Sequence, residues 1–339
     1  MKIVIYKIQI KIKIRSATLK KKFVITVDLG GTKILSALIN SKKKIEEKVK
    51  IPTDAEKGTE FLVECIADSV KKLLKKSKRN EKEIAALCLG VPGTVNPNSG
   101  IISIAPNLNI VDFNIKKSLQ KYFDIPVLLE NDVNMAALGI KSFEYNDKVN
   151  NMLVVFVGTG IGGALLFNGE MYRGSSFFAG EIGHMKIRPS GSFAVDNNDL
   201  TFENYASRTA MVNSIIQRAK KEETVLKDFI KSGKKIKSKS LSKALDAKDK
   251  VITEEMEKGC KAIGTVLGSL TTLLNLDTIV LGGGVVEANE DFMIPRIKKA
   301  FSKSVISSAG RIVKIKATKL GDDAPLFGGY ALAEEFLKD

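Results

Sequence analysis

The fold of this chain is decided by residues 152–185, whose sequence is MLVVFVGTGIGGALLFNGEMYRGSSFFAGEIGHM. The stretch begins with the apolar run Met152–Val157, which predicts a buried strand, and continues through a glycine-rich turn at residues 158–163. A second apolar run, Ala164–Phe167, predicts another strand, and the Asn-Gly pair that follows is typical of a hairpin. Because glycine has no Cβ, its backbone N–H groups can approach an anion closely, so we expect a phosphate-binding loop between two strands.

Gly158, Gly160 and Gly163 also satisfy the G-x-G-x-x-G pattern of dinucleotide-binding proteins. That fold requires a helix to begin at the glycine turn, so that the helix N-terminus faces the pyrophosphate. The residues after this turn are apolar and end in Asn-Gly, which favours a strand. The pattern therefore favours a phosphate-binding hairpin over a dinucleotide-binding domain.

A similar arrangement occurs near the start of the chain. Phe23–Asp28 predicts a strand, residues 29–33 (LGGTK) a glycine turn, and Ile34–Ile39 a returning strand. Two strand–turn–strand units predict two related lobes, each with a phosphate-binding hairpin facing a shared cleft. A third glycine group, residues 282–284, follows the predicted strand Thr278–Leu281.

Composition limits the function classes. The 339 residues are 44% hydrophobic and carry a net charge of +16, which suits a globular chain with two domains or lobes. No apolar run approaches the ~20 residues of a membrane span. The positive charge is scattered, with few arginines and no aromatic–basic platform, so we expect neither a nucleic-acid nor a membrane partner. Cys65, Cys88 and Cys260 are widely spaced in apolar contexts, which favours reduced core residues in a cytoplasmic protein.

Two lysine-rich segments stand apart from the predicted lobes. Residues 1–22 alternate isoleucine with basic or polar residues, and we expect a disordered or mis-started extension rather than an anion-binding tail or an added edge strand. Residues 231–243 favour a solvated loop or linker over a polyanion contact. Helical spacing of apolar residues predicts helices at Phe61–Lys76, Val133–Ile140, Phe202–Ala219, Val251–Leu276 and Ala324–Leu337.

Asp132 lies directly after the predicted strand Val127–Leu129, at the start of a predicted helix. It suits two roles: an N-cap of that helix, or a general base aimed at a hydroxyl beside a nucleotide phosphate. Its neighbour Asn131 has an amide that can both donate and accept a hydrogen bond to a hydroxyl.

Carboxylate, amide and imidazole groups elsewhere supply the same pairing of donors and acceptors, which a sugar requires. Glu181 and His184 lie three residues apart, and Glu203 follows. The spacing of His184, the single histidine of the chain, supports a structural role and a ligand-binding role equally well. Asn107 suits either a ligand contact or a turn.

Taken together, these motifs resemble the ROK family (repressor, open reading frame, kinase). Its enzymes are ATP-dependent sugar kinases of the actin/hexokinase-like (ribonuclease H-like) fold. The matching motifs follow the family's order over about residues 23–339: VDLGGTK at 27–33, GVPG at 90–93, APNL at 105–108, ENDVNMAALG at 130–139, GTGIGGALLFNGEMYRG at 158–174, AGEIGHM at 179–185, LGGGVV at 281–286 and LGDDAPLFGGYALA at 320–333.

The resemblance implies an α/β fold with two duplicated lobes around a central cleft. The N-terminal lobe would comprise residues 23–135, completed by the C-terminal helix at about 320–339, and the C-terminal lobe residues 136–319. The implied activity is the ATP- and Mg²⁺-dependent phosphorylation of a hexose hydroxyl, the 6-OH of glucose or a related sugar, in a homodimer. A non-catalytic sugar-sensing or transcription-regulatory ROK protein is the alternative.

The resemblance also implies functional roles for individual residues of this chain. Asp132 matches the catalytic base, and Asp28 would help to position Mg²⁺ and the phosphates. The phosphate loops would be formed by Gly30, Gly31, Thr32 and Lys33 and by Thr159 and Gly160, the adenosine border by Gly282 and Gly283, and the sugar contacts by Asn107, Asn131, Glu181, His184 and Glu203.

The chain departs from the family in its zinc motif. The family usually carries C-x-C-G-x-x-G-C-x-E after the histidine, and the histidine and three cysteines bind a structural zinc. Alignment from Glu203 places Ala194, Asp196 and Thr201 at the cysteine positions, so we expect no structural zinc. Repressor members also place a helix-turn-helix domain before the core, whereas 22 residues precede Phe23, which favours the kinase class.

Overall fold

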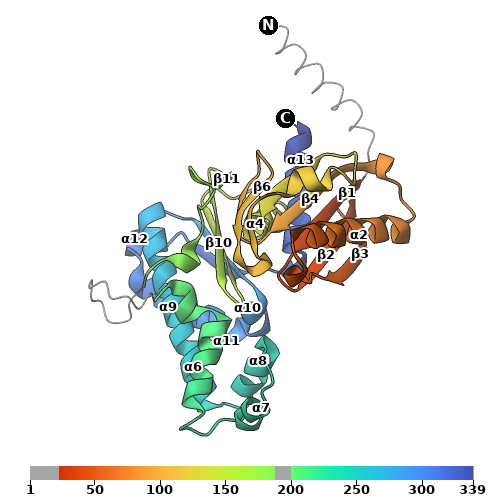
Figure 1. Ribbon diagram of the computed structural model, residues 1–339. Helices are drawn as coiled ribbons and strands as arrows, with labels where there is room; N and C mark the ends of the chain where they lie inside the picture. The colour runs from red at the N-terminus through yellow and green to blue at the C-terminus, as the bar shows by residue number, and fades with distance from the viewer. Residues whose placement is uncertain (1–22, 188–199, 339) are drawn as a thin grey trace. The chain divides into compact units, whose positions relative to one another are not determined.

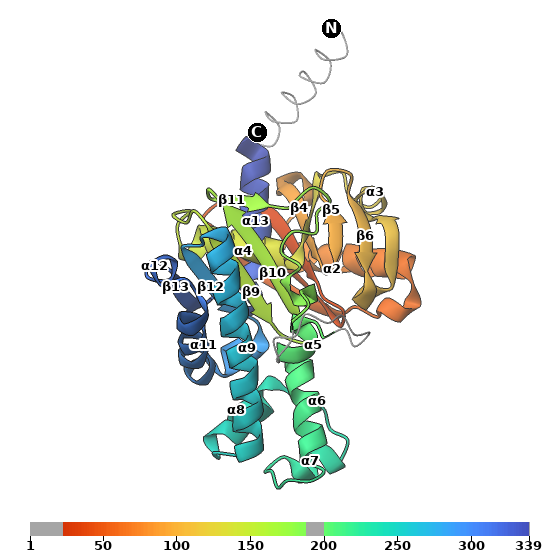
Figure 2. The same ribbon diagram turned by 90° about the vertical axis from the view of Figure 1, so that its left-hand side faces the viewer.

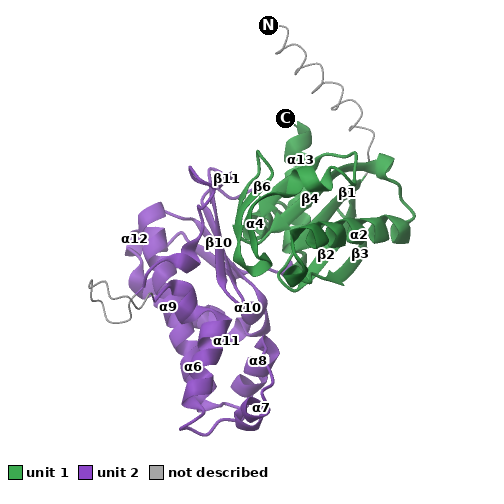
Figure 3. Ribbon diagram, in the orientation of Figure 1, with its two compact units in different colours: residues 1–147, 322–339 green, residues 148–321 purple. Residues whose placement is uncertain are grey.

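The structure, a computed structural model, describes residues 23–187 and 200–338. The chain divides into two compact units, of which unit 1 is residues 1–147 and 322–339 and unit 2 is residues 148–321 (Figure 3). A boundary after residue 135 would cut helix α4 (Asp132–Glu144), which lies entirely in unit 1. The proposed extension at residues 1–22 lies outside the described residues, as do Ala194 and Asp196 of the zinc alignment.

Unit 1 is built on a five-stranded sheet with the order β3-β2-β1-β4-β8 (Figure 1). Strands β1, β2 and β3 are antiparallel neighbours, whereas β4 and β8 run parallel to β1. A separate antiparallel sheet has the order β5-β6-β7. The strands are β1 (Phe23–Leu29), β2 (Lys33–Asn40), β3 (Ile45–Pro52), β4 (Ile84–Val91), β5 (Thr94–Asn96), β6 (Ile101–Ala105), β7 (Ile110–Asn114) and β8 (Val127–Asn131).

Helices cover both faces of the unit 1 sheet. Alternate residues of β1 face opposite sides: Ile25 and Val27 pack with α2, whereas Val24 packs with α13. Helix α13 crosses α4 so closely that a Cβ on Gly328 would lie 1.5 Å from the carbonyl oxygen of Met135, so this crossing requires glycine. The helices of unit 1 are α2 (Thr59–Ser77), α3 (Ile115–Leu119), α4 and α13 (Ala324–Lys338), with 3₁₀ turns η1 (Ala55–Lys57), η2 (Glu81–Glu83) and η3 (Pro106–Leu108), and η5 (Gly321–Asp323) at the unit boundary.

Unit 2 repeats the sheet of unit 1, with the order β11-β10-β9-β12-β13 (Figure 2). Strands β9, β10 and β11 are antiparallel neighbours, and β12 and β13 run parallel to β9. The same order and directions in both units confirm the predicted duplication. A strand, β10, follows the glycine turn after β9, so the turn does not begin a dinucleotide-binding helix. The strands are β9 (Met152–Val157), β10 (Ile161–Phe167), β11 (Glu170–Tyr172), β12 (Thr278–Gly282) and β13 (Lys314–Ala317).

The helices of unit 2 differ from the prediction in several places, and the helices at Lys227–Lys231, Gly284–Ala288, Glu290–Ser304 and Ser307–Gly310 were not predicted. The expected helix at residues 202–219 is broken at Ser207, whose backbone is extended and whose hydroxyl accepts a hydrogen bond from the N–H of Ala210. Residues 238–243, expected in a loop, lie in α8, because Leu241 and Ala244 are buried. The helices are α5 (Phe202–Ala206), α6 (Arg208–Arg218), α7 (Lys227–Lys231), α8 (Ser238–Asp246), α9 (Lys250–Leu274), α10 (Gly284–Ala288), α11 (Glu290–Ser304) and α12 (Ser307–Gly310), with the 3₁₀ turn η4 (Ile182–His184).

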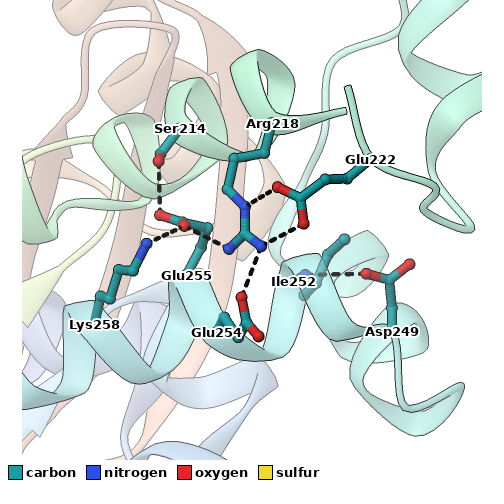
Figure 4. A network of polar contacts seen from close by, with 8 residues as sticks. All are labelled: Ser214, Arg218, Glu222, Asp249, Ile252, Glu254, Glu255 and Lys258. Carbon is teal, nitrogen blue, oxygen red and sulfur yellow. Dashed lines mark hydrogen bonds and ion pairs between the residues drawn. The ribbon is translucent and has the colours of Figure 1, made fainter. Parts of the chain in front are cut away.

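An ion-pair network joins α6 to α9 (Figure 4). The guanidinium of Arg218 donates to Glu222, Glu254 and Glu255, and Ser214 and Lys258 also donate to Glu255. Glu255 is 5% exposed, so this carboxylate depends on its partners for the hydrogen bonds that water would otherwise supply. Within the described ranges, no helix is long and apolar enough to cross a membrane.

Candidate functional site

The carboxyl ends of three parallel strands in unit 1 bring polar residues together. Asp28, near the end of β1, pairs with Gly90 of β4, and Val91 pairs with Asn131 at the end of β8. Asp132 follows as the first residue of α4. Side chains at the carboxyl ends of parallel strands open at the same edge of a sheet, which is where α/β proteins bind ligands.

Asp28 lies among charged neighbours at this edge. Its pKa is raised from 3.8 to about 7, mainly because the carboxyl is buried and then because the carboxylate of Asp132 lies nearby. The ammonium of Lys33 lowers the pKa of Asp28, and the carboxylate of Asp322 raises it. Lys33 itself forms an ion pair with Asp322, with 2.5 Å between Nζ and Oδ2. An added cation would favour the ionised form of Asp28.

The first glycine loop connects β1 to β2 and is held by backbone and side-chain contacts. The N–H of Gly30 donates to the carbonyl of Lys33 (2.9 Å), and the hydroxyl of Thr53 donates to the carbonyl of Gly30 (2.6 Å). A Cβ on Gly31 would lie 3.4 Å from the carbonyl oxygen of Asn107, so Asn107 lies against the loop. Within unit 1, a predicted sugar contact therefore adjoins a predicted phosphate loop.

Asn131, not Asp132, is the N-cap of α4. Its Oδ1 accepts hydrogen bonds from the N–H groups of Val133 (2.9 Å) and Asn134 (3.0 Å), and its Nδ2 donates to the carbonyl of Gly93 (3.0 Å). The interpretation of Asp132 as the cap is therefore wrong. Asp132 is partly buried in the first turn, and its Oδ1 accepts from the N–H of Val133 (2.9 Å).

Glu130 supports this turn and was not singled out from the sequence. The side chain is almost completely buried, at 1% exposure. Its Oε1 accepts hydrogen bonds from the N–H of Asn131 and the Nδ2 of Asn134, both at 3.0 Å. Glu130 therefore fixes the direction in which the strand β8 enters α4, and with it the position of Asp132.

The second glycine loop connects β9 to β10 in unit 2. The N–H of Gly158 donates to the carbonyl of Gly160 (2.9 Å), which closes a tight hairpin. The Oε2 of Glu203 accepts a hydrogen bond from the N–H of Ile161 (2.7 Å), and a Cβ on Gly160 would lie 2.2 Å from that oxygen. Glu203, predicted as a sugar contact, is therefore hydrogen-bonded to the second loop through one of its carboxylate oxygens.

Glu181 and His184 lie at the turn η4. The Nδ1 of His184 is 3.2 Å from the Oε2 of Glu181, and the His184 side chain is 75% exposed. Thr201, at one of the family's cysteine positions, caps α5 by accepting a hydrogen bond from the N–H of Asn204. Residues 23–187 and 200–338 contain no group of three or more His, Cys, Asp or Glu residues placed to hold a metal ion.

The third glycine group begins at the end of β12. Gly283 has a φ of +87°, and a Cβ there would lie 2.5 Å from the carbonyl oxygen of Val157, so both the backbone conformation and the space require glycine. Val157 directly precedes the second loop, so the two glycine turns of unit 2 are neighbours.

The predicted site residues thus form two groups, one in each unit. Within each group, strand ends and glycine turns bring together residues that are far apart in the sequence. Unit 1 holds Asp28, Gly30, Gly31, Thr32, Lys33, Asn107, Asn131 and Asp132, and unit 2 holds Thr159, Gly160, Glu181, His184, Glu203, Gly282 and Gly283.

The ROK family model matches residues 24–336. The chain belongs to the ROK family. This ROK protein has the actin/hexokinase-like α/β fold of the family, as the resemblance implied.

Named relatives of this ROK protein include kinases and a repressor. A glucokinase from Halalkalibacterium halodurans is 31% identical over 318 residues, which are 93% of this chain and 96% of the relative. A solved ROK glucokinase from Streptomyces griseus, in complex with glucose and AMPPNP, superposes with a TM-score of 0.77 at 26% identity, covering 92% of this chain and 99% of that one. A xylose repressor from Caldicellulosiruptor bescii is 27% identical over 316 residues, 91% of this chain and 77% of the repressor.

Proposed function

We propose that this ROK protein is an ATP-dependent hexose kinase that phosphorylates the 6-OH of glucose or of a related sugar, with Asp132 as the general base. The observation that carries the proposal is the grouping of Asp28, Lys33 and Asp132 beside a glycine loop at the carboxyl edge of the unit 1 sheet. The glucokinase relatives support the same reaction class.

In this mechanism Asp132 accepts the proton of the sugar hydroxyl as that oxygen attacks the γ-phosphorus of ATP, and ADP leaves. The exposed backbone of the two glycine loops, with Lys33, binds the phosphate oxygens and stabilises the charge that they carry. Asn131 and Glu130 hold the turn that aims Asp132. Replacing either of them would misplace the base without removing it.

The carboxylates fit a magnesium ion by their chemistry. Mg²⁺ prefers oxygen ligands and is bound in kinases by one or two carboxylates together with the nucleotide's phosphates. Asp28 would contribute such a carboxylate, since it lies at the carboxyl end of β1, close to the carboxylate of Asp132 and beside the first glycine loop. When bound, the ion would neutralise charge on the phosphates.

The sugar contacts that we propose are Asn107, Asn131, Glu181, His184 and Glu203. Two of them already have structural partners. The Oδ1 of Asn131 accepts two helix N–H groups, so this residue would offer a sugar its remaining Nδ2 hydrogen. Glu203 uses Oε2 on the second loop, which leaves Oε1 for a sugar hydroxyl.

A coupled ADP-release assay with glucose, mannose, fructose and N-acetylated amino sugars tests the proposal. We expect ADP release with at least one hexose. Asp132→Asn should lower kcat at least ~100-fold, the usual contribution of a general base, while the sugar KM stays within a few-fold. Asp112→Asn, which removes an exposed carboxylate of the same unit, is the matched control. Near-normal turnover by Asp132→Asn would exclude Asp132 as the base.

The second candidate is a sugar-sensing regulator, which the xylose repressor relative favours. It predicts no ADP release with any sugar, together with sugar binding that calorimetry detects. The family resemblance also supports a cytoplasmic homodimer. Size-exclusion chromatography with light scattering would measure the mass of the assembly.

A further inference from the structure

We propose that Arg208 is a phosphate-binding residue of the second glycine loop. The proposal rests on the kinase function above and adds a residue to it. Arg208 is the first residue of α6, 49 residues beyond Thr159, and neither its position nor any motif in the sequence marks it as part of the loop.

Three hydrogen bonds attach the start of α6 to the second loop. The N–H of Arg208 donates to the carbonyl of Gly158 (3.0 Å), and the Nη2 of Arg208 donates to the Oγ1 of Thr159 (2.9 Å). The hydroxyl of Thr209 donates to the carbonyl of Thr159 (2.7 Å). The guanidinium is therefore held at the loop residue that, by the proposed function, contacts phosphate.

The partners of Arg208 differ from those of three other arginines in the described residues. Arg79, Arg218 and Arg296 each form an ion pair with glutamate, and Arg218 binds three of them (Figure 4). In the part of the chain that the structure describes, the partner of the Arg208 guanidinium is the neutral hydroxyl of Thr159. Its charge is thus not balanced by a carboxylate there.

A bound phosphate would provide a negatively charged partner for this solvent-accessible guanidinium. A guanidinium has five N–H donors, and one of them is engaged on Thr159, so the remaining donors can bind phosphate oxygens in the fork geometry that suits this anion. A merely structural arginine would brace the loop through its hydrogen bonds. A phosphate-binding arginine would in addition make nucleotide affinity depend on charge.

Calorimetric titration of the full-length protein separates these two roles. The probes are AMPPNP with Mg²⁺, and adenosine, which has no phosphate. We expect Arg208→Gln to weaken AMPPNP binding at least ~10-fold and to leave adenosine binding within about 2-fold, because charged hydrogen bonds to phosphate are lost. Arg208→Lys should retain part of the affinity, and the Arg208→Gln protein should lose less AMPPNP affinity than the wild type when salt is raised.

Two control variants complete the experiment. Thr209→Val removes a neutral hydrogen bond to the same loop, and Arg311→Gln removes an exposed charge elsewhere in unit 2. Equal losses in Arg208→Gln and Thr209→Val would show that Arg208 only braces the loop, and equal losses in Arg208→Gln and Arg311→Gln would show a general effect of net charge. Unchanged AMPPNP affinity in Arg208→Gln would also overturn the proposal. A wild-type protein that binds no AMPPNP and phosphorylates no sugar would instead refute the kinase function, and this proposal with it.

Discussion

Replacing Asp28 by asparagine should stabilise the magnesium-free protein and do so in a pH-dependent manner. The pKa of Asp28 rises from 3.8 to about 7 on folding, chiefly because the carboxyl is buried. An acid with a raised pKa binds its proton more tightly in the folded state. The contribution of Asp28 to the free energy of unfolding therefore falls as pH rises from 3.8 to about 7 and is constant above that. Asparagine has the same shape and no charge, so the variant does not have this loss.

The magnitude follows from the two pKa values. Each pKa unit corresponds to about 1.4 kcal/mol, so the ionised carboxylate costs the folded protein about 4 kcal/mol at pH 8. At pH 4 the folded protein keeps the proton, and the cost is close to zero. The stability difference between Asp28→Asn and the wild type should therefore grow by about 4 kcal/mol between pH 4 and pH 8.

Urea unfolding followed by circular dichroism at 222 nm, in buffer with EDTA, would measure this difference. Asp112→Asn, which removes an exposed carboxylate of unit 1, controls for the loss of one charge. A difference between Asp28→Asn and the wild type that is the same at pH 4 and pH 8 would refute the argument from burial. Adding Mg²⁺ and ATP analogue should stabilise the wild type more than the variant, because the variant lacks the carboxylate.

Three further substitutions test contacts within unit 1 or within unit 2: two through stability and one through sugar binding. Gly328→Ala should destabilise the protein by about 3 kcal/mol or more, measured by urea unfolding, because the new Cβ would lie 1.5 Å from a carbonyl oxygen of α4; a loss below about 1 kcal/mol would contradict this close crossing. Arg218→Met should cost about 2 kcal/mol at pH 7 in the same assay, since Glu255 would remain buried with fewer partners, and an unchanged stability would show that the network is not required. Gly160→Ala should displace the carboxylate of Glu203 from the second loop and raise the sugar KM in the ADP-release assay, whereas an unchanged KM would exclude Glu203 from sugar binding.

The sequence predicted the strands and turns of the site because their signals are local. Apolar runs that end in glycine turns identified both loops and the duplicated sheet, and Asp132 was recognised from its place directly after a predicted strand. The role of Asp28 came from the family resemblance, and the structure shows that the two residues share one edge of the sheet. The choice of N-cap was not predictable, since Asn131 and Asp132 are adjacent and both are good caps. Only the hydrogen bonds of the Asn131 amide decide between them.

The contacts that the sequence did not predict join residues that are distant in the chain. Arg208 reaches Thr159 across 49 positions, and Glu203 reaches Ile161 across 42. The spacing of apolar residues in the sequence does not indicate such contacts, because they depend on how α5 and α6 pack on the second loop. The break at Ser207 was missed for a related reason: the apolar spacing continues through it, and only the extended backbone shows that one helix ends and another begins.

The way the chain builds unit 1 has a consequence for its synthesis. Unit 2 is one continuous segment, residues 148–321, whereas unit 1 needs α13 from the last part of the chain to cover one face of its sheet. During synthesis, unit 1 therefore exposes the apolar residues that α13 buries until the whole of unit 2 has been translated. The unit that is translated first thus waits for a distant segment before its sheet is covered, and a partly covered apolar sheet is prone to aggregation.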